Sequence, residues 1–223
     1  MTTTPETTTP ETTTPETAPE TAAETAVAQT EAAAGAGASR VVDGVTFPAP
    51  GTYVLDPTHT RIGFVARHLM VTKVRGLFSE FAGSITVAED PKNSTAEATL
   101  QTISIETGTA DRDTHLRSGD FLEAEKYPEI SFRNARIQSQ KGASFTVVGD
   151  LTIKETTRAV TLDVEIDGVA KDPYGNEKLA VTASAEIDRE EFGMTWNVAL
   201  ETGGVLVSKK VKLEIEAQAA LQA

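Results

Sequence analysis

Apolar and polar residues alternate along most of the chain after residue 51, and this pattern constrains the fold more than any other feature. In residues 160–166 every apolar residue is followed by Thr, Asp or Glu. A β-strand places successive side chains on opposite faces, so such alternation indicates strands with one buried and one solvated face. The same pattern occurs in residues 62–66, 96–100, 130–132, 151–153, 179–187 and 211–215.

About eight such segments are separated by turn-forming residues, as at 90–93, 141–142, 172–176 and 203–204. Half-buried strands are typical of antiparallel sheets, and closing the sheet removes its exposed edges. The sequence therefore predicts an all-β, eight-stranded antiparallel barrel.

Residues 109–127 interrupt the alternation with a helical pattern. Thr109 is a candidate N-cap, and Asp111 and Asp113 in the first turn favour the helix dipole. Gly119 is expected to end this helix, and Asp120 to cap a second short helix that ends before Pro128. We therefore expect a short helical insertion near the middle of the β domain.

The chain begins with three copies of Thr-Thr-Thr-Pro-Glu in residues 2–16. Proline at every fifth position and the lack of an apolar face predict a disordered tail over residues 1–39. Residues 40–51 are expected to be a linker with a short strand, residues 52–217 the barrel, and residues 218–223 the C-terminal end.

The formal net charge is −13, and outside residues 1–39 the chain carries 27 acidic and 20 basic residues. A net acidic domain argues against nucleic-acid binding and against attraction to anionic lipid headgroups. No apolar run approaches the roughly 20 residues that span a bilayer, so membrane insertion is not expected. The N-terminus lacks signal-peptide features, which favours a cytoplasmic location.

The chain has no cysteine, and its three histidines lack metal-ligand spacing. No nucleophile elbow, phosphate loop or dinucleotide motif is present. We therefore expect no metal, no cofactor other than a bound ligand, and no catalytic residues.

Several blocks in fixed order resemble the YceI family of bacterial lipid- or polyisoprenoid-binding proteins. They include YVLDPTHT at 53–60, RDTHLRSGDF at 112–121, YPEISF at 127–132 and IDREEFGM at 187–194. The resemblance covers about residues 52–217 and implies an extended lipocalin-like barrel around a long apolar cavity. The chain departs from the family at Lys154-Glu155, where a turn glycine is common.

Such a barrel is either hollow or filled by its own side chains. Small inward alanines between large residues favour a partly hollow interior, and a solid core is the alternative. The expected ligand-binding residues are Ile62, Phe64, Ala66, His68, Phe78, Leu100, Arg112, His115, Phe121, Phe132 and Leu162.

The polar members of this set have two interpretations each. His68 shares the parity of Ile62 and is expected to point inward, as a headgroup contact or as a hydrogen-bonded core histidine. Arg112 and His115 lie three residues apart on one helical face and, with Asp113, form a candidate cluster for a pyrophosphate or carboxylate. The alternative is an internal salt bridge that fixes the helix to the barrel.

The sequence thus favours a protein that binds, carries or sequesters a long-chain amphipathic lipid such as a polyisoprenoid. One alternative is an enzyme that modifies such a lipid, with His68 and His115 as acid and base. Another is a structural or stress-related interaction protein with a solid core. The oligomeric state is left open, and a homodimer is one alternative.

Overall fold

The protein is described by a computed structural model over residues 39–42, 44–201 and 203–222, so the predicted disorder of residues 1–39 lies, apart from Ser39, outside the described residues. The strands are β1 (Arg40–Val42), β2 (Val45–Phe47), β3 (Gly51–Leu55), β4 (Arg61–His68), β5 (Thr72–Phe78), β6 (Phe81–Val87), β7 (Thr95–Gln101), β8 (Ile105–Glu106), β9 (Glu129–Lys141), β10 (Ser144–Ile153), β11 (Thr156–Lys171), β12 (Glu177–Asp188) and β13 (Lys210–Leu221). The helices are α1 (Ala110–Arg117) and the 3₁₀ turns η1 (Pro91–Asn93), η2 (Thr102–Ser104) and η3 (Arg189–Phe192).

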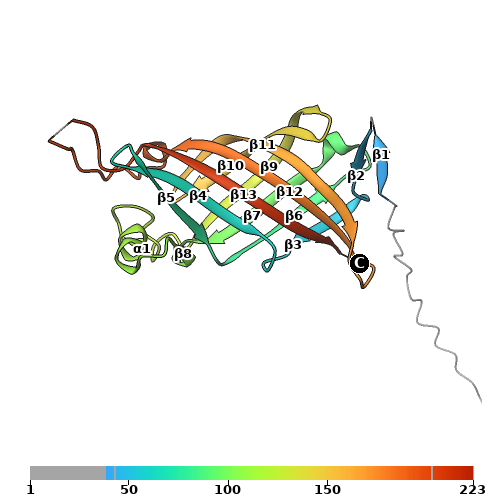
Figure 1. Ribbon diagram of the computed structural model, residues 1–223, viewed down its shortest axis with the longest axis horizontal. Coiled ribbons are helices and arrows are strands. Elements are labelled where there is room, and N and C mark those ends of the chain that lie inside the picture. The colour runs from blue at the N-terminus through green and yellow to red at the C-terminus, as the bar shows by residue number, and fades with distance from the viewer. Residues whose placement is uncertain (1–38, 43, 202, 223) are drawn as a thin grey trace, which may run out of the picture. The chain divides into compact units, whose positions relative to one another are not determined.

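Eight of these strands close into an antiparallel barrel, which confirms the predicted fold (Figure 1). The order around the barrel is β3, β6, β7, β9, β10, β11, β12 and β13, and β13 pairs with β3 to close the ring. β11 has 16 residues, so at about 3.3 Å per residue it is about 50 Å long. An interior this long suits an extended occupant.

β13 pairs with two different strands along its length. Residues 212–216 pair with β4, and residues 219–221 pair with β3. The chain leaves the sheet between these two strands, where Asp56 N–H donates to the carbonyl of Gln218 at 2.8 Å and Thr60 Oγ1 bonds both the N–H and the carbonyl of Gln218. β4, β5 and β8 thereby extend one wall beyond β3 towards α1.

The helical insertion lies at one end of the barrel (Figure 1). Thr109 is the N-cap residue as predicted, but its hydroxyl accepts from Arg112 and does not cap the helix. The predicted second helix is wrong, because residues 119–126 form successive turns. Glu123 has φ +50°, a left-handed conformation that no right-handed helix accommodates, and the Asp120 carboxylate bonds His115 instead of a backbone N–H.

The hairpin of β1 and β2 lies at the opposite end, where residues 40–51 were expected to form a linker with a short strand. Glu177 Oε1 accepts hydrogen bonds from Ala49 N–H at 2.7 Å and from the Tyr53 hydroxyl at 2.6 Å. Tyr53 and Ala49 are completely buried, and burial together with the Glu177 carboxylate raises the pKa of the Tyr53 hydroxyl. These bonds tie the segment before β3 to the start of β12, and β13 continues through Leu221, past the predicted limit of 217.

The inward-facing residues form two clusters. The larger lies towards α1 and includes Phe78, Leu100, Ile153 and Phe192. The smaller lies towards the β1–β2 end around Tyr53 and Leu179. Many of their members, such as Ile62, Leu100 and Leu162, come from the alternating segments, whereas Phe78, Phe192 and Tyr53 lie outside them.

Candidate functional site

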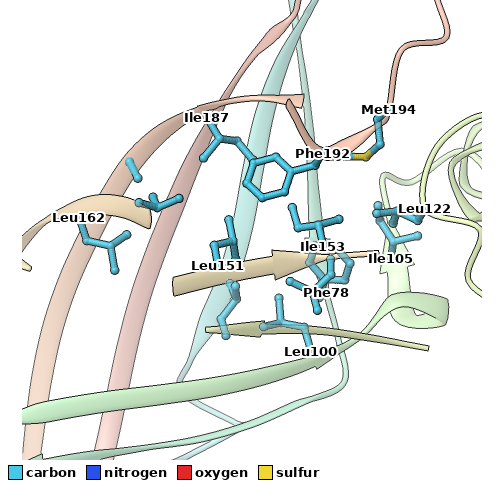
Figure 2. Close-up of a cluster of buried hydrophobic side chains, with 14 residues drawn as sticks. Phe78, Leu100, Ile105, Leu122, Leu151, Ile153, Leu162, Ile187, Phe192 and Met194 are labelled. Atoms are coloured by element: carbon cyan, nitrogen blue, oxygen red, sulfur yellow. The ribbon is translucent and has the colours of Figure 1, made fainter. Parts of the chain in front are cut away.

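A cavity of about 350 Å³ occupies the interior of the barrel. Its lining comes from both hydrophobic clusters and consists almost entirely of apolar side chains. Figure 2 shows Phe78, Leu100, Leu151, Ile153, Leu162 and Ile187 pointing into this interior from five strands, with Leu151 and Ile153 both on β10 and Phe192 near Ile187. The volume falls within the range of small-molecule sites, so the core is not filled by its own side chains.

Eight of the predicted binding residues line this cavity: Ile62, Phe64, Ala66, Phe78, Leu100, Phe121, Phe132 and Leu162. Most of the small residues expected to keep the interior open also line it, namely Ala66, Ala96, Ala98 and Ala183. The cavity lining therefore coincides with residues that alternate inward along the strands and with the small alanines between them.

The three polar candidates are placed elsewhere. His68 is the last residue of β4, where it forms an isolated antiparallel β-bridge with Val207, and it is not part of the cavity lining. Arg112 donates to the hydroxyl and carbonyl of Thr107 and to the hydroxyl of Thr109, at 2.7 to 3.0 Å. His115 Nε2 lies 2.9 Å from an Asp120 carboxylate oxygen.

The expected cluster of Arg112, Asp113 and His115 therefore separates into two sets of contacts. Asp113 accepts from the N–H and the hydroxyl of Thr107, which joins α1 to β8, and Arg112 bonds the same threonine. The His115 ring packs edge-on against Trp196 and Phe121, with ring centres 4.6 and 5.1 Å away. Among the described residues, no hydrogen bond or ion pair joins Arg112 to His115.

Two phenylalanines of the lining lie over glycines on neighbouring strands. A Cβ atom on Gly149 would come within 2.3 Å of the Phe132 ring, and one on Gly76 within 2.4 Å of the Phe64 ring. Each glycine thus provides the space in which an aromatic ring lies against the barrel wall. The rings would otherwise project further into the cavity.

Arg189 is a cavity residue that the sequence analysis missed. The charged run 188–191 would be expected to form a solvated turn, and η3 is indeed a turn, but Arg189 is only 3% exposed and lines the cavity. Its guanidinium donates to the carbonyls of Ser208 and Met194, while Nη2 is buried without a hydrogen-bond partner among the described residues. Burial lowers the pKa of Arg189, partly offset by Glu190 and Asp188.

In sequence, Arg189 is distinguished only by its position in the block IDREEFGM, between the buried Ile187 and Phe192. Its chain neighbours are charged, which suggested solvent exposure. Only the contacts with residues 194 and 208, on the connection to β13, reveal that the side chain is enclosed.

Across the described ranges, no helix is long and apolar enough to cross a bilayer. In the same part of the chain, no three His, Asp or Glu side chains come together in a way that could hold a metal ion.

Comparison with known proteins places the chain in a family. Residues 53–219 match the model of the YceI-like domain, which is three-quarters of the chain. The chain belongs to the YceI-like family. Within this family, the UPF0312 protein SA2479 of Staphylococcus aureus strain N315 is 41% identical over 170 residues, which cover 74% of this chain and 95% of the relative.

Solved structures share the fold of this YceI-like chain. The YCEI protein of Campylobacter jejuni superimposes with a TM-score of 0.61 at 28% identity, over 70% of this chain and 90% of that one. BcnA of Burkholderia cenocepacia gives 0.62 at 21% identity, covering 74% and 99%. A structure described as a polyisoprenoid binding domain from Saccharophagus degradans gives 0.54 at 14% identity, covering 76% and 98%.

Proposed function

We propose that the barrel binds a long-chain amphipathic lipid, with a polyisoprenoid as the ligand class, and so carries or sequesters it. The observation that carries this proposal is the apolar cavity of about 350 Å³ inside a closed barrel. The choice of a polyisoprenoid is supported by the Saccharophagus neighbour, whose description names that ligand.

The gain from removing an apolar chain from water is sufficient for such a function. Burial contributes about 0.8 kcal/mol per CH₂-sized group, so each five-carbon isoprene unit contributes about 4 kcal/mol before ordering costs. Three enclosed units contribute about 12 kcal/mol, which leaves the about 8 kcal/mol of micromolar binding after about 4 kcal/mol is lost to immobilisation.

Arg189 gives the proposed site a polar end. It is the cavity residue with a buried donor that lacks a partner, and it lies at the α1 end, where Met194 and Phe121 also line the cavity. A ligand oxygen that accepts from this guanidinium would lower the cost of burying the charge. We therefore orient the ligand with its oxygen-bearing end near Arg189 and its tail towards Tyr53.

The direct test is solvent extraction of the gently purified full chain, followed by lipid mass spectrometry. The expected result is a long-chain lipid at about one molecule per chain. Ala183→Phe should reduce that occupancy because Ala183 lines the cavity, whereas Ala170→Phe on the neighbouring strand β11 should not, because Ala170 is exposed. A lipid-free extract after expression with lipid present, together with no uptake of an added prenyl alcohol, would contradict the proposal.

The orientation has its own test, in which prenyl phosphate and prenyl alcohol of equal chain length are compared. Arg189→Gln should weaken phosphate binding at least tenfold more than alcohol binding, because only the phosphate loses an ion pair between two opposite charges along with the hydrogen bond. Equal losses for both ligands would assign Arg189 a purely structural role through Ser208 and Met194.

Binding without turnover remains a prediction. His68 and His115, the acid and base of the enzymatic alternative, do not line the cavity, which supports a binding role. Incubating the full chain with a prenyl phosphate and following the lipid by mass spectrometry checks this. Conversion of the lipid beyond a heat-denatured control would overturn it.

A further inference from the structure

The tip of the β4–β5 hairpin exposes three consecutive large apolar residues at the same end of the barrel as α1 (Figure 1). Leu69 is 44% exposed, Met70 51% and Val71 77%. Leu69 N–H donates to the carbonyl of Leu206 at 2.8 Å, and Leu206 N–H to that of Val198, which is itself 45% exposed. The hairpin tip, residues 69–71, is thus an exposed apolar surface, and Leu206 lies between it and the exposed Val198.

The backbone at this tip is not the one that leucine and methionine prefer. Val71 N–H donates to the carbonyl of His68 and closes a turn whose central residues, Leu69 and Met70, have φ +53° and +61°. Turns with two positive φ angles favour Asn-Gly. Local stability therefore does not explain why large apolar side chains occupy these positions.

Positive charge surrounds the tip although the domain as a whole is acidic. Residues 57–79 contain four Arg or Lys and no Asp or Glu, and residues 203–213 contain three Lys and no Asp or Glu. Arg67 and Lys73 are cross-strand partners next to the tip, both exposed, and neither forms an ion pair within the described part of the chain. Like charges placed directly opposite repel each other, so a negatively charged partner would relieve this pair.

Two of the three lysines at the start of β13 are already paired. Lys209 contacts Glu190 at 2.8 Å and Lys212 contacts Glu214 at 3.0 Å. Lys210 is exposed and, among the described residues, forms no ion pair, and Glu201 is the acidic residue on the adjoining loop. Within the described residues, the cations near the tip that form no ion pair are therefore Arg67, Lys73, Arg75 and Lys210. Glu214 faces two of them, because Lys212 and, to a smaller extent, Arg75 and Lys73 lower its pKa.

From these observations we propose that the hairpin tip docks on the surface of an anionic lipid bilayer. Leu69, Met70 and Val71 enter the boundary between headgroups and acyl chains, and Arg67, Lys73 and Lys210 contact the lipid phosphates. Apolar side chains combined with nearby cations give reversible interfacial binding without a membrane-spanning segment. The negative net charge of the whole domain does not indicate this surface, because the cations are concentrated in residues 57–79 and 203–213.

Docking would bring the cavity close to the bilayer. Ala66 and Val207 line the cavity. Ala66 lies on β4 three residues before Leu69, and Val207 forms a β-bridge with His68, the residue next to the tip. The docking itself does not depend on the proposed carrier function, because it concerns only the outside of the barrel.

The test is co-sedimentation of the full chain with vesicles of phosphatidylcholine alone or mixed with phosphatidylglycerol. The full chain should bind the anionic vesicles, and the binding should fall with added salt. Leu69→Asn/Met70→Gly, which suits the turn and so preserves folding, should weaken binding by about tenfold or more. Arg67→Gln/Lys73→Gln should weaken it by about fivefold per charge removed.

Tyr174→Ser is the matched control, because Tyr174 is 90% exposed on the β11–β12 turn, at the end of the barrel remote from the tip. It should leave vesicle binding unchanged. Equal sedimentation of the full chain with neutral and anionic vesicles, or wild-type binding by the tip variant, overturns the proposal. A full chain that ignores vesicles but is a dimer, with a monomeric tip variant, also overturns it and makes the tip an interface between copies.

Discussion

Gly149 determines how much of the interior Phe132 occupies, and Gly149→Ala tests this. The added Cβ would lie 2.3 and 2.6 Å from two atoms of the Phe132 ring and 3.0 Å from the carbonyl oxygen of Arg133. The ring must therefore move, and because Phe132 lines the cavity, it moves into space that a ligand would use. Overpacking of this kind costs about 1–3 kcal/mol.

Gly168→Ala on β11 is the control, because nothing lies within 4 Å of a Cβ at that position. Replacing glycine by alanine within a strand gains about 0.5–1 kcal/mol from backbone entropy, and this gain is common to both variants. The difference between their free energies of unfolding, measured by urea denaturation, should therefore be the packing cost of about 1–3 kcal/mol.

The same variant links packing to ligand capacity. Gly149→Ala should bind less of a prenyl alcohol than the wild type, and adding Phe132→Leu should restore both stability and binding, because the smaller side chain vacates the contact. If the free energies of unfolding of Gly149→Ala and Gly168→Ala are equal, or if Phe132→Leu restores neither stability nor binding, the contact between the Phe132 ring and Gly149 does not contribute to either property.

Three further predictions concern the two ends of the barrel. Glu177→Leu leaves Ala49 N–H without its acceptor and should lower the free energy of unfolding, measured by urea denaturation, by about 1–3 kcal/mol. Glu177→Gln should lower it less because its amide oxygen still accepts, and equal losses for the two variants would contradict this. Hydrogen bonds from Thr58 and, to a smaller extent, His59 lower the pKa of Asp56 from 3.8 to about 2, so ionised Asp56 stabilises the fold above about pH 4 and this contribution is lost as the pH falls towards 2. The unfolding temperature of Asp56→Asn should therefore depend less on pH between 4 and 2 than that of the wild type, and an identical pH dependence would refute the assignment. Leu69→Asn/Met70→Gly should raise the free energy of unfolding by about 1–3 kcal/mol, because left-handed φ angles cost about 1–2 kcal/mol in branched or long residues, and no gain would mean that the turn is unstrained.

The barrel and most of its lining could be predicted from the sequence because a period of two is a local property. Once Ile62 is placed inside, strand geometry places Phe64 and Ala66 inside as well. The same reasoning located the contributions of Leu100, Phe132 and Leu162. It required no knowledge of which strands are neighbours.

The errors arose where a conformation depends on distant contacts. Asp120 resembles a helix cap in sequence, but His115 takes its carboxylate and Glu123 adopts a positive φ, so turns form instead. Arg189 resembles a surface residue, but the carbonyl of Ser208, on the far side of a long connection, holds it inside. Neither contact leaves a periodic signal in the sequence.

The two ends of the barrel differ in a way that gives the cavity a direction. At the β1–β2 end, Phe47, Ala49 and Tyr53 are at most 2% exposed, and Ala49 and Tyr53 donate hydrogen bonds to Glu177, so packed side chains and hydrogen bonds occupy this end. At the α1 end the lining includes the buried cation Arg189, and exposed apolar residues lie just outside, at the hairpin tip. An amphipathic lipid placed tail-first from a bilayer at the α1 end would leave its polar end beside Arg189. The reverse orientation would place that end on the side of Ser84 and Glu97, where no cation among the described residues lines the cavity. The chemical asymmetry of the ends therefore favours a single path and a single orientation for the ligand.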